Sequence, residues 1–226
     1  MRCHRALVRL CDRLARSGFH SLRFDYYGTG DSAGPSGSGD IDEWVANTRT
    51  AANELRDISG AENISMLGVR LGGAIATQAC SSETNIDKLV LWDPIADGES
   101  YMRQLTHLHK AFTDDLDRFP KPASRSRNLF SDELVGMTIP PALRDSIRRI
   151  DLASLESMNA EHVSVVSTID RDECREMADA LGRLTDSHDY EIVNEPAGWD
   201  TLTDLGVVMM PHQMLQTMLD KLSTNA

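Results

Sequence analysis

The sequence predicts an α/β fold in which a mostly parallel sheet is flanked by helices. Short β-rich runs alternate with helical stretches of ten or more residues along most of the chain. Parallel strands need such helical crossovers, because tight turns join only antiparallel neighbours. A strand followed by a glycine-rich turn and a helix, at residues 63–81, is a second observation of the same kind.

The length and composition fit one domain. The chain has 226 residues, of which 41% are hydrophobic and 26% are charged, which is enough apolar material to close a single core. Its formal net charge is −12. Because a negative field repels phosphate backbones and anionic lipid, this charge argues against nucleic acid and against membrane surfaces as partners.

The chain opens with a helix. Leu7, Leu10, Cys11 and Leu14 recur at helical spacing, and Gly18 follows where a left-handed cap is expected. The later elements follow from the same periodicities. We expect strands at 20–26, 63–69, 88–94, 162–169 and 190–195, and helices at 41–58, 71–81, 171–184 and from Pro211 onward.

One segment breaks the alternation. Residues 98–160 carry charged helical stretches around two proline sites, and we interpret them as a lid or cap embedded in the single domain 1–226.

Four scattered cysteines and the lack of a continuous apolar leader indicate a reducing, cytoplasmic setting. No pattern in the sequence indicates a metal or another cofactor.

Two motifs carry a resemblance to a known family. SMLGVRLGG at 65–73 supplies the strand, sharp turn and helix of a nucleophile elbow, with GVRLG in place of GxSxG. LRFDYYGTGDSAG at 22–34 resembles the strand and loop that precede the elbow in serine-aminopeptidase-like α/β hydrolases. With HRAL near the front and WDP at 92–94, the chain is similar to the exosortase-system-associated subgroup of that superfamily.

The resemblance implies an α/β-hydrolase fold with Arg70 at the nucleophile position. Arginine stays protonated and only donates hydrogen bonds, so it cannot form an acyl-enzyme. Val69 and Leu71 flank it and are expected to line the pocket. Members of the family have further strands before the front helix. Their apparent absence here predicts an open sheet edge, covered by a second copy of the chain or by a partner chain.

Arg70 and Asp93 are expected to form the centre of the pocket. Asp93 ends the strand beside the elbow strand, and neighbouring parallel strands deliver their carboxyl ends to one rim. A guanidinium at a helix N-terminus opposes the helix dipole, so an anion should lie close to Arg70. A ligand and an intramolecular ion pair with Asp93 both remain open at this point.

Further candidates follow from the family pattern. The triad acid would fall at Asp170, while Trp199 occupies the usual place of the triad histidine. His212 could reach the pocket only from the last helix. His4, in the front helix, and Tyr27, after the first strand, are expected to contribute to binding.

Three functions remain open at this point. The first is an atypical enzyme, such as a lyase, eliminase or cyclase, acting on an acyl or polyketide-like molecule. The second is an inactive pseudo-hydrolase that binds or scaffolds a partner in a biosynthetic pathway. The third retains hydrolysis, with water activated by Asp93 or His212. The expected ligand is a small acyl-type substrate or an anionic molecule.

Overall fold

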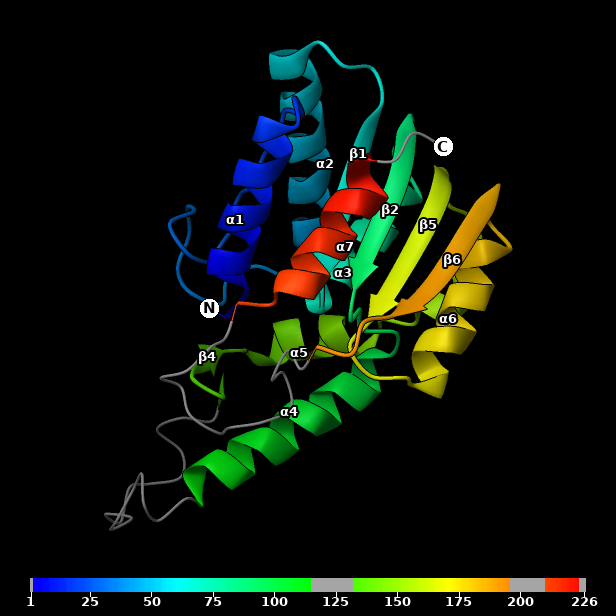
Figure 1. Ribbon diagram of the computed structural model, residues 1–226. Coiled ribbons are helices and arrows are strands. Elements are labelled where there is room, and N and C mark those ends of the chain that lie inside the picture. Colours follow the sequence, from blue (N-terminus) through cyan, green and yellow to red (C-terminus); the bar gives the residue numbers. More distant parts are fainter. Residues whose placement is uncertain (1, 115–131, 196–209, 224–226) are drawn as a thin grey trace.

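A four-stranded parallel sheet organises the molecule (Figure 1). The computed structural model describes residues 2–114, 132–195 and 210–223. The strands are β1 (Ile64–Val69), β2 (Ile86–Trp92), β5 (Ala160–Ser167) and β6 (Ser187–Ile192), in the order β1-β2-β5-β6. This is the mostly parallel, helix-flanked sheet that the sequence predicts.

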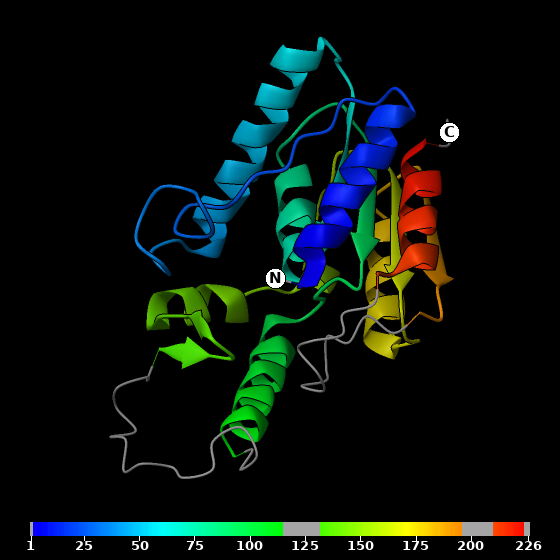
Figure 2. The same ribbon diagram turned by 60° about the vertical axis from the view of Figure 1, so that its left-hand side comes forward.

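Helices cover both faces of the sheet. Helices α1 (Arg2–Arg16) and α7 (His212–Ser223) lie side by side over one face, as Figures 1 and 2 show. The other face is covered by α2 (Ile41–Ser59), α3 (Leu71–Cys80) and α6 (Asp172–Gly182). The central strand β2 is therefore buried along nearly its whole length, as expected for a parallel strand between two helical layers.

The segment predicted as a cap lies beyond the carboxyl ends of the strands (Figure 1). It contains α4 (Gly98–Thr113), a short hairpin of β3 (Glu133–Leu134) and β4 (Met137–Thr138), α5 (Pro141–Arg148) and the 3₁₀ helix η2 (Leu152–Ser154). Residues 115–131 of this segment are outside the described residues. Apolar side chains of α4 and α5 join the core cluster on the α3 side of the sheet.

The sequence prediction was wrong for one strand. No strand forms at residues 20–26, although Leu22, Phe24 and Tyr26 alternate with polar residues as in a half-buried strand. None of the described strands pairs with this run. A strand is stable only when its backbone groups are paired with a neighbour, so the local pattern alone did not produce one.

The other predicted elements form with small shifts at their ends. The largest shift is in β6, which begins and ends three residues before the predicted bounds, and β2 and β5 each begin and end two residues early. Gly18 has the predicted left-handed conformation, with φ of 88°. Within residues 2–114, 132–195 and 210–223, no helix combines the length and apolarity needed to cross a membrane.

Candidate functional site

The site begins at a strained turn between β1 and α3. Arg70 has φ of 53° and ψ of −122°, a region that non-glycine residues rarely occupy and that costs on the order of 1–3 kcal/mol. The turn is held by its backbone: the Arg70 amide donates to the Trp92 carbonyl at 3.0 Å, and the Arg70 carbonyl accepts from Gly73 at 2.9 Å. The surrounding fold therefore fixes the position of residue 70.

Glycine makes this turn sterically feasible. A Cβ on Gly68 would lie 2.4 Å from the Cα of Gly73, so any larger residue would push the helix start away from the strand end. Gly73 in turn lies close to Pro94, where an added Cβ would meet the proline Cβ at 3.0 Å. The small residues that suggested an elbow in the sequence serve this close approach.

The Arg70 guanidinium lies against α4. It donates to Gln104 Oε1 at 3.1 Å and to the Asp93 carbonyl oxygen at 3.5 Å. Its Cζ lies 5.9 Å from the centre of the Tyr101 ring, within the range of a cation–π contact. The orientation of the long side chain is therefore set by Asp93, directly after β2, and by Gln104 and Tyr101 on α4.

The structure brings Arg70 and Asp93 together, with the contact described above made by the Asp93 backbone. Asp93 is completely buried, and its carboxylate accepts from Thr168 twice, from the amide at 2.9 Å and from the hydroxyl at 2.8 Å. These bonds join the end of β2 to the end of β5. The carboxylate therefore serves as an internal tie, which was not expected from the sequence.

A cavity of about 280 Å³ lies at this rim of the sheet. Its lining comes from the ends of β1 and β2 and from the starts of α4 and α6: Arg70, Pro94, Ile95, Ala96, Asp97, Ser100, Tyr101, Gln104, Arg171, Glu173 and Cys174. Three of these, Arg70, Asp97 and Arg171, are the N-cap residues of α3, α4 and α6. Three helix N-termini therefore converge on one cavity.

Helix N-termini carry partial positive charge, and their first amides lack partners within the helix. One of these amides, that of Ser100, donates a hydrogen bond to the Asp97 carboxylate at 2.6 Å. Glu173 is the other acidic lining residue and is exposed to solvent. The two arginines and the helix starts make the cavity suited to a small anion.

Burial raises the pKa of two groups near the guanidinium. It raises the pKa of the Tyr101 hydroxyl, although the charge of Arg70 opposes the shift, so this hydroxyl remains protonated and can donate. Burial also raises the pKa of the Cys3 thiol, again against the charge of Arg70. The start of α1 therefore lies within electrostatic reach of Arg70 through Cys3, whereas the predicted His4 is exposed.

Two other predicted catalytic residues do not belong to the described cavity lining. Asp170 is exposed and binds Arg175 Nη2 at 2.7 and 2.6 Å, while the Tyr190 hydroxyl donates to it at 3.3 Å. His212 is the exposed first residue of α7. Asp170, just before α6, therefore forms a surface ion pair with Arg175 of that helix, and neither Asp170 nor His212 is among the residues that line the cavity.

The predicted binding residues are dispersed. Val69 and Leu71 flank the turn, but each packs into an apolar cluster, on opposite faces of the sheet. Tyr27 is half-buried against Gly34, in the loop that follows residues 20–26. Trp199 lies outside the described residues, so its predicted place in the pocket stays a prediction.

Sequence reasoning missed the contribution of α4 and α6. Ser100, Tyr101 and Gln104 recur at helical spacing and share one face of α4, directly after the strand that ends at Asp93. That spacing was visible in the sequence, but the whole segment was interpreted as a cap. Arg171, at the start of α6, gave no comparable signal.

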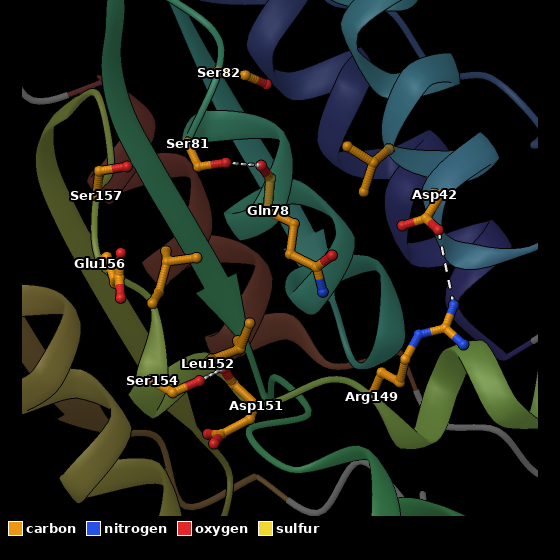
Figure 3. A pocket seen from close by; sticks show the side chains of 12 residues that line it. Asp42, Gln78, Ser81, Ser82, Arg149, Asp151, Leu152, Ser154, Glu156 and Ser157 are labelled. Carbon is orange, nitrogen blue, oxygen red and sulfur yellow. Dashed lines mark hydrogen bonds and ion pairs between the residues drawn. The ribbon is translucent and has the colours of Figure 1, made fainter.

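A larger hollow of about 520 Å³ lies elsewhere, between α2, the end of α3 and residues 149–157 (Figure 3). An ion pair of 3.7 Å between Arg149 and Asp42 spans one side. Two of its hydroxyls, on Ser81 and Ser154, donate to nearby backbone carbonyls. Because it contains neither a strained residue nor convergent helix starts, we place the candidate site at Arg70 despite the smaller volume.

In the three described ranges, no group of three or more His, Cys, Asp or Glu side chains is arranged to hold a metal ion.

A parallel sheet with a strained strand–turn–helix and a cavity at its carboxyl rim defines an α/β-hydrolase-fold protein. Residues 4–133, more than half of the chain, match the model of the serine aminopeptidase S33 family. The chain therefore belongs to this family. A search of curated proteins gives no match.

Solved structures support the fold. The chain is similar to an esterase from Pyrococcus furiosus with a TM-score of 0.62 and 13% identity, over 95% of this chain and 72% of that one. It is similar to an esterase from Exiguobacterium antarcticum with a TM-score of 0.60 and 17% identity, over 97% and 87%. Est1E from Butyrivibrio proteoclasticus, solved with ferulic acid, gives 0.59 and 15% identity, over 98% and 84%.

Proposed function

We propose that this chain uses an α/β-hydrolase fold to bind a small carboxylate-bearing acyl molecule in the Arg70 cavity, without an acyl-serine intermediate. The observation that carries the proposal is the convergence of the three N-cap positions, two of them arginines, on one cavity at the carboxyl rim of the sheet. A carboxylate there meets a guanidinium fork and partially positive helix ends together.

The degenerate elbow supports binding over hydrolysis. Residue 70 has the strained backbone geometry from which a nucleophile would be presented, but the side chain is a permanent cation. Asp93, the nearest carboxylate on the adjacent strand, is buried and bonded to Thr168, which leaves it poorly placed to activate water. The cavity therefore offers recognition of charge more readily than acid–base chemistry.

The neighbouring polar groups define the rest of the ligand. Ser100, Tyr101 and Gln104 give hydroxyl and amide groups along one wall, and Pro94, Ile95 and Ala96 supply apolar surface. A volume of about 280 Å³ suits a molecule of modest size. Ferulic acid, bound by the structurally similar Est1E, combines a carboxylate, a short apolar body and polar substituents, and it is a suitable first probe.

A second candidate function is catalysis by a lyase, eliminase or cyclase. It is favoured by the strained turn, because such strain is commonly retained where geometry matters for chemistry. In that case Arg70 would stabilise an oxyanion that develops on the bound acyl group. Conversion of a bound ligand to product, followed by mass spectrometry, separates this candidate from binding alone.

We extend the proposal to context. We propose that the chain belongs to the exosortase-system-associated subgroup, on the basis of Arg70 at the elbow, and that it acts in a biosynthetic pathway. Its four free thiols agree with a reducing, cytoplasmic setting.

The test is a calorimetric titration of ferulate and of short-chain carboxylates into the wild-type protein and into Arg70→Gln and Arg171→Gln. Loss of one guanidinium contact should weaken binding roughly tenfold or more, which is about 1.4 kcal/mol. Arg9→Gln is the matched control, since Arg9 is an exposed residue on the outer surface of α1 and its loss changes the net charge equally.

Equal affinities for the wild-type protein, Arg70→Gln and Arg9→Gln would overturn the proposal, as would the absence of measurable binding of any carboxylate tested. Equal weakening by Arg70→Gln and Arg9→Gln would indicate a general charge effect and would also overturn the proposal.

A further inference from the structure

A hydrogen-bonded set of side chains lies at the opposite end of the sheet from Arg70. Strands β5 and β6 are parallel, with His162 opposite Ser187 and Ser164 opposite Asp189. Because side chains two residues apart on a strand share a face, all four lie on one face of the two strands. In Figure 1 the amino ends of β5 and β6 lie at the end of the sheet away from α4. The set is therefore separate from the candidate site.

The imidazole of His162 lies between a hydroxyl and a carboxylate. Its Nδ1 is 2.7 Å from Ser187 Oγ, and its Nε2 is 2.8 Å from Asp189 Oδ2. Because a carboxylate only accepts hydrogen bonds, the neutral imidazole carries its proton on Nε2. The lone pair of Nδ1 then accepts a hydrogen bond from the Ser187 hydroxyl. A base is thus in contact with the proton that a serine nucleophile must lose.

The carboxylate that sets this proton arrangement is itself held in place. Lys221 Nζ donates to Asp189 Oδ1 at 2.6 Å, and the Ser164 hydroxyl donates to Oδ2 at 2.8 Å. Partial burial opposes ionisation of Asp189, but the hydrogen bonds from Lys221, Ser164 and His162 lower its pKa. Asp189 is therefore a carboxylate at neutral pH and accepts the proton of Nε2.

The hydroxyl in this set is open to solvent, whereas the groups that orient it are partly shielded. Ser187 is exposed, while the side chains of His162 and Asp189 are 23% and 33% exposed. A reagent can therefore reach the Ser187 oxygen. Ser154 is also exposed, but its hydroxyl donates to the Asp151 carbonyl at 3.0 Å, which is not a base that takes up the proton.

We propose that Ser187 is a nucleophilic modification site that accepts an acyl group from an activated ester, with His162 as its general base. The Ser187 oxygen bonds to the ester carbonyl carbon, and its proton moves to Nδ1 of His162. The bond to the leaving alcohol then breaks, and that alcohol takes the proton from His162. The products are acyl-Ser187 and the free alcohol. The proposal covers this single transfer, without later hydrolysis, and it does not depend on the Arg70 cavity.

Labelling of the whole chain with a fluorophosphonate tests the proposal. This reagent presents phosphorus in place of the acyl carbon; an Oγ–P bond forms, fluoride leaves, and peptide mass spectrometry locates the stable adduct. In the wild-type protein, Ser187 should be labelled roughly tenfold or more faster than Ser154, because only Ser187 has a base in contact. This comparison lies within one folded molecule, so it needs no variant.

Two variants then separate the base from mere exposure. His162→Gln keeps a polar group at the site but takes up no proton, so Ser187 labelling should slow by roughly tenfold or more. Ser154→Ala is the control and should leave Ser187 labelling unchanged. Equal labelling rates of Ser187 and Ser154 in the wild-type protein would overturn the proposal. So would a rate at Ser187 that a folded His162→Gln protein retains in full.

Discussion

Two cationic centres of the molecule are built differently. Near the amino ends of β5 and β6, Lys221 donates to Asp189 at 2.6 Å and to Glu191 at 3.0 Å, so its charge is neutralised by carboxylates. At the carboxyl rim, Arg70 donates to the neutral oxygens of Gln104 and of the Asp93 carbonyl, beside a cavity. The first arrangement stabilises the fold, whereas the second holds a guanidinium at the wall of a cavity, which is where we propose that a ligand binds.

Asp93 makes the contrast clearer. It is the carboxylate closest to Arg70 in the sheet order, yet it bonds to Thr168 and ties β2 to β5. Asp93 and Asp189 therefore stabilise the fold, whereas the role that we propose for Arg70 is recognition of a ligand. Substitutions at these positions should separate the two roles.

The largest expected effect is on folding, from Asp93→Ala. This change leaves the Thr168 amide and hydroxyl without their acceptor in a fully buried place, which should destabilise the protein by about 3–5 kcal/mol. Urea unfolding monitored by circular dichroism measures it. Asp93→Asn, which keeps one acceptor oxygen, should cost clearly less, and equal losses in the two variants would contradict this role.

A smaller effect is expected from acid. Partial burial opposes ionisation of Asp189, but hydrogen bonds from Lys221, Ser164 and His162 outweigh it and lower the pKa of Asp189 below its ordinary value of 3.8. A lowered acid pKa contributes stability that is present above the unfolded value and is lost as pH falls through the folded value.

Below about pH 4 the network should therefore lose at most about 1 kcal/mol, since Asp189 is one-third exposed and solvent screens the pair. Unfolding free energies measured at pH 6 and pH 3 check this. Asp189→Asn should show a correspondingly smaller difference between the two pH values, and the same difference in both proteins would refute the assignment.

The smallest effect on stability is expected from Arg70→Ser, because the side chain is only partly buried and the strained backbone is unchanged. Its melting temperature should stay close to that of the wild-type protein. It should not hydrolyse p-nitrophenyl acetate, since the described cavity lining contains no histidine to activate a new hydroxyl.

The double variant Arg70→Ser/Trp199→His tests the sequence-based expectation that residue 199 occupies the place of the family histidine. It should gain turnover over the single variant. Robust turnover by Arg70→Ser alone would show that another residue already serves as the base, so the assignment of the histidine place to residue 199 would be wrong.

The sequence was sufficient for features that depend on local periodicity and on glycine. The alternation of strands and helices, the left-handed Gly18 and the tight turn at Arg70 all follow from such patterns. The run at 20–26 was predicted wrongly because a strand needs a neighbour, and no local pattern supplies one.

The orientation of side chains at the site could not be predicted in the same way. Asp93 turns to Thr168, which is 75 residues further along the chain, so the pairing depends on how two strands meet. The same limit applies to Arg171, which reaches the cavity only because α6 starts beside α4 in the fold.

The central claim is that the cavity at Arg70 recognises negative charge, and the most direct measurement compares a ligand with its uncharged counterpart. Dissociation constants of ferulate and of ferulamide should be determined for the wild-type protein and for Arg70→Gln. The account predicts that wild-type protein prefers the carboxylate by roughly tenfold or more and that the preference largely disappears in Arg70→Gln. Equal affinity of wild-type protein for the carboxylate and the amide would contradict it.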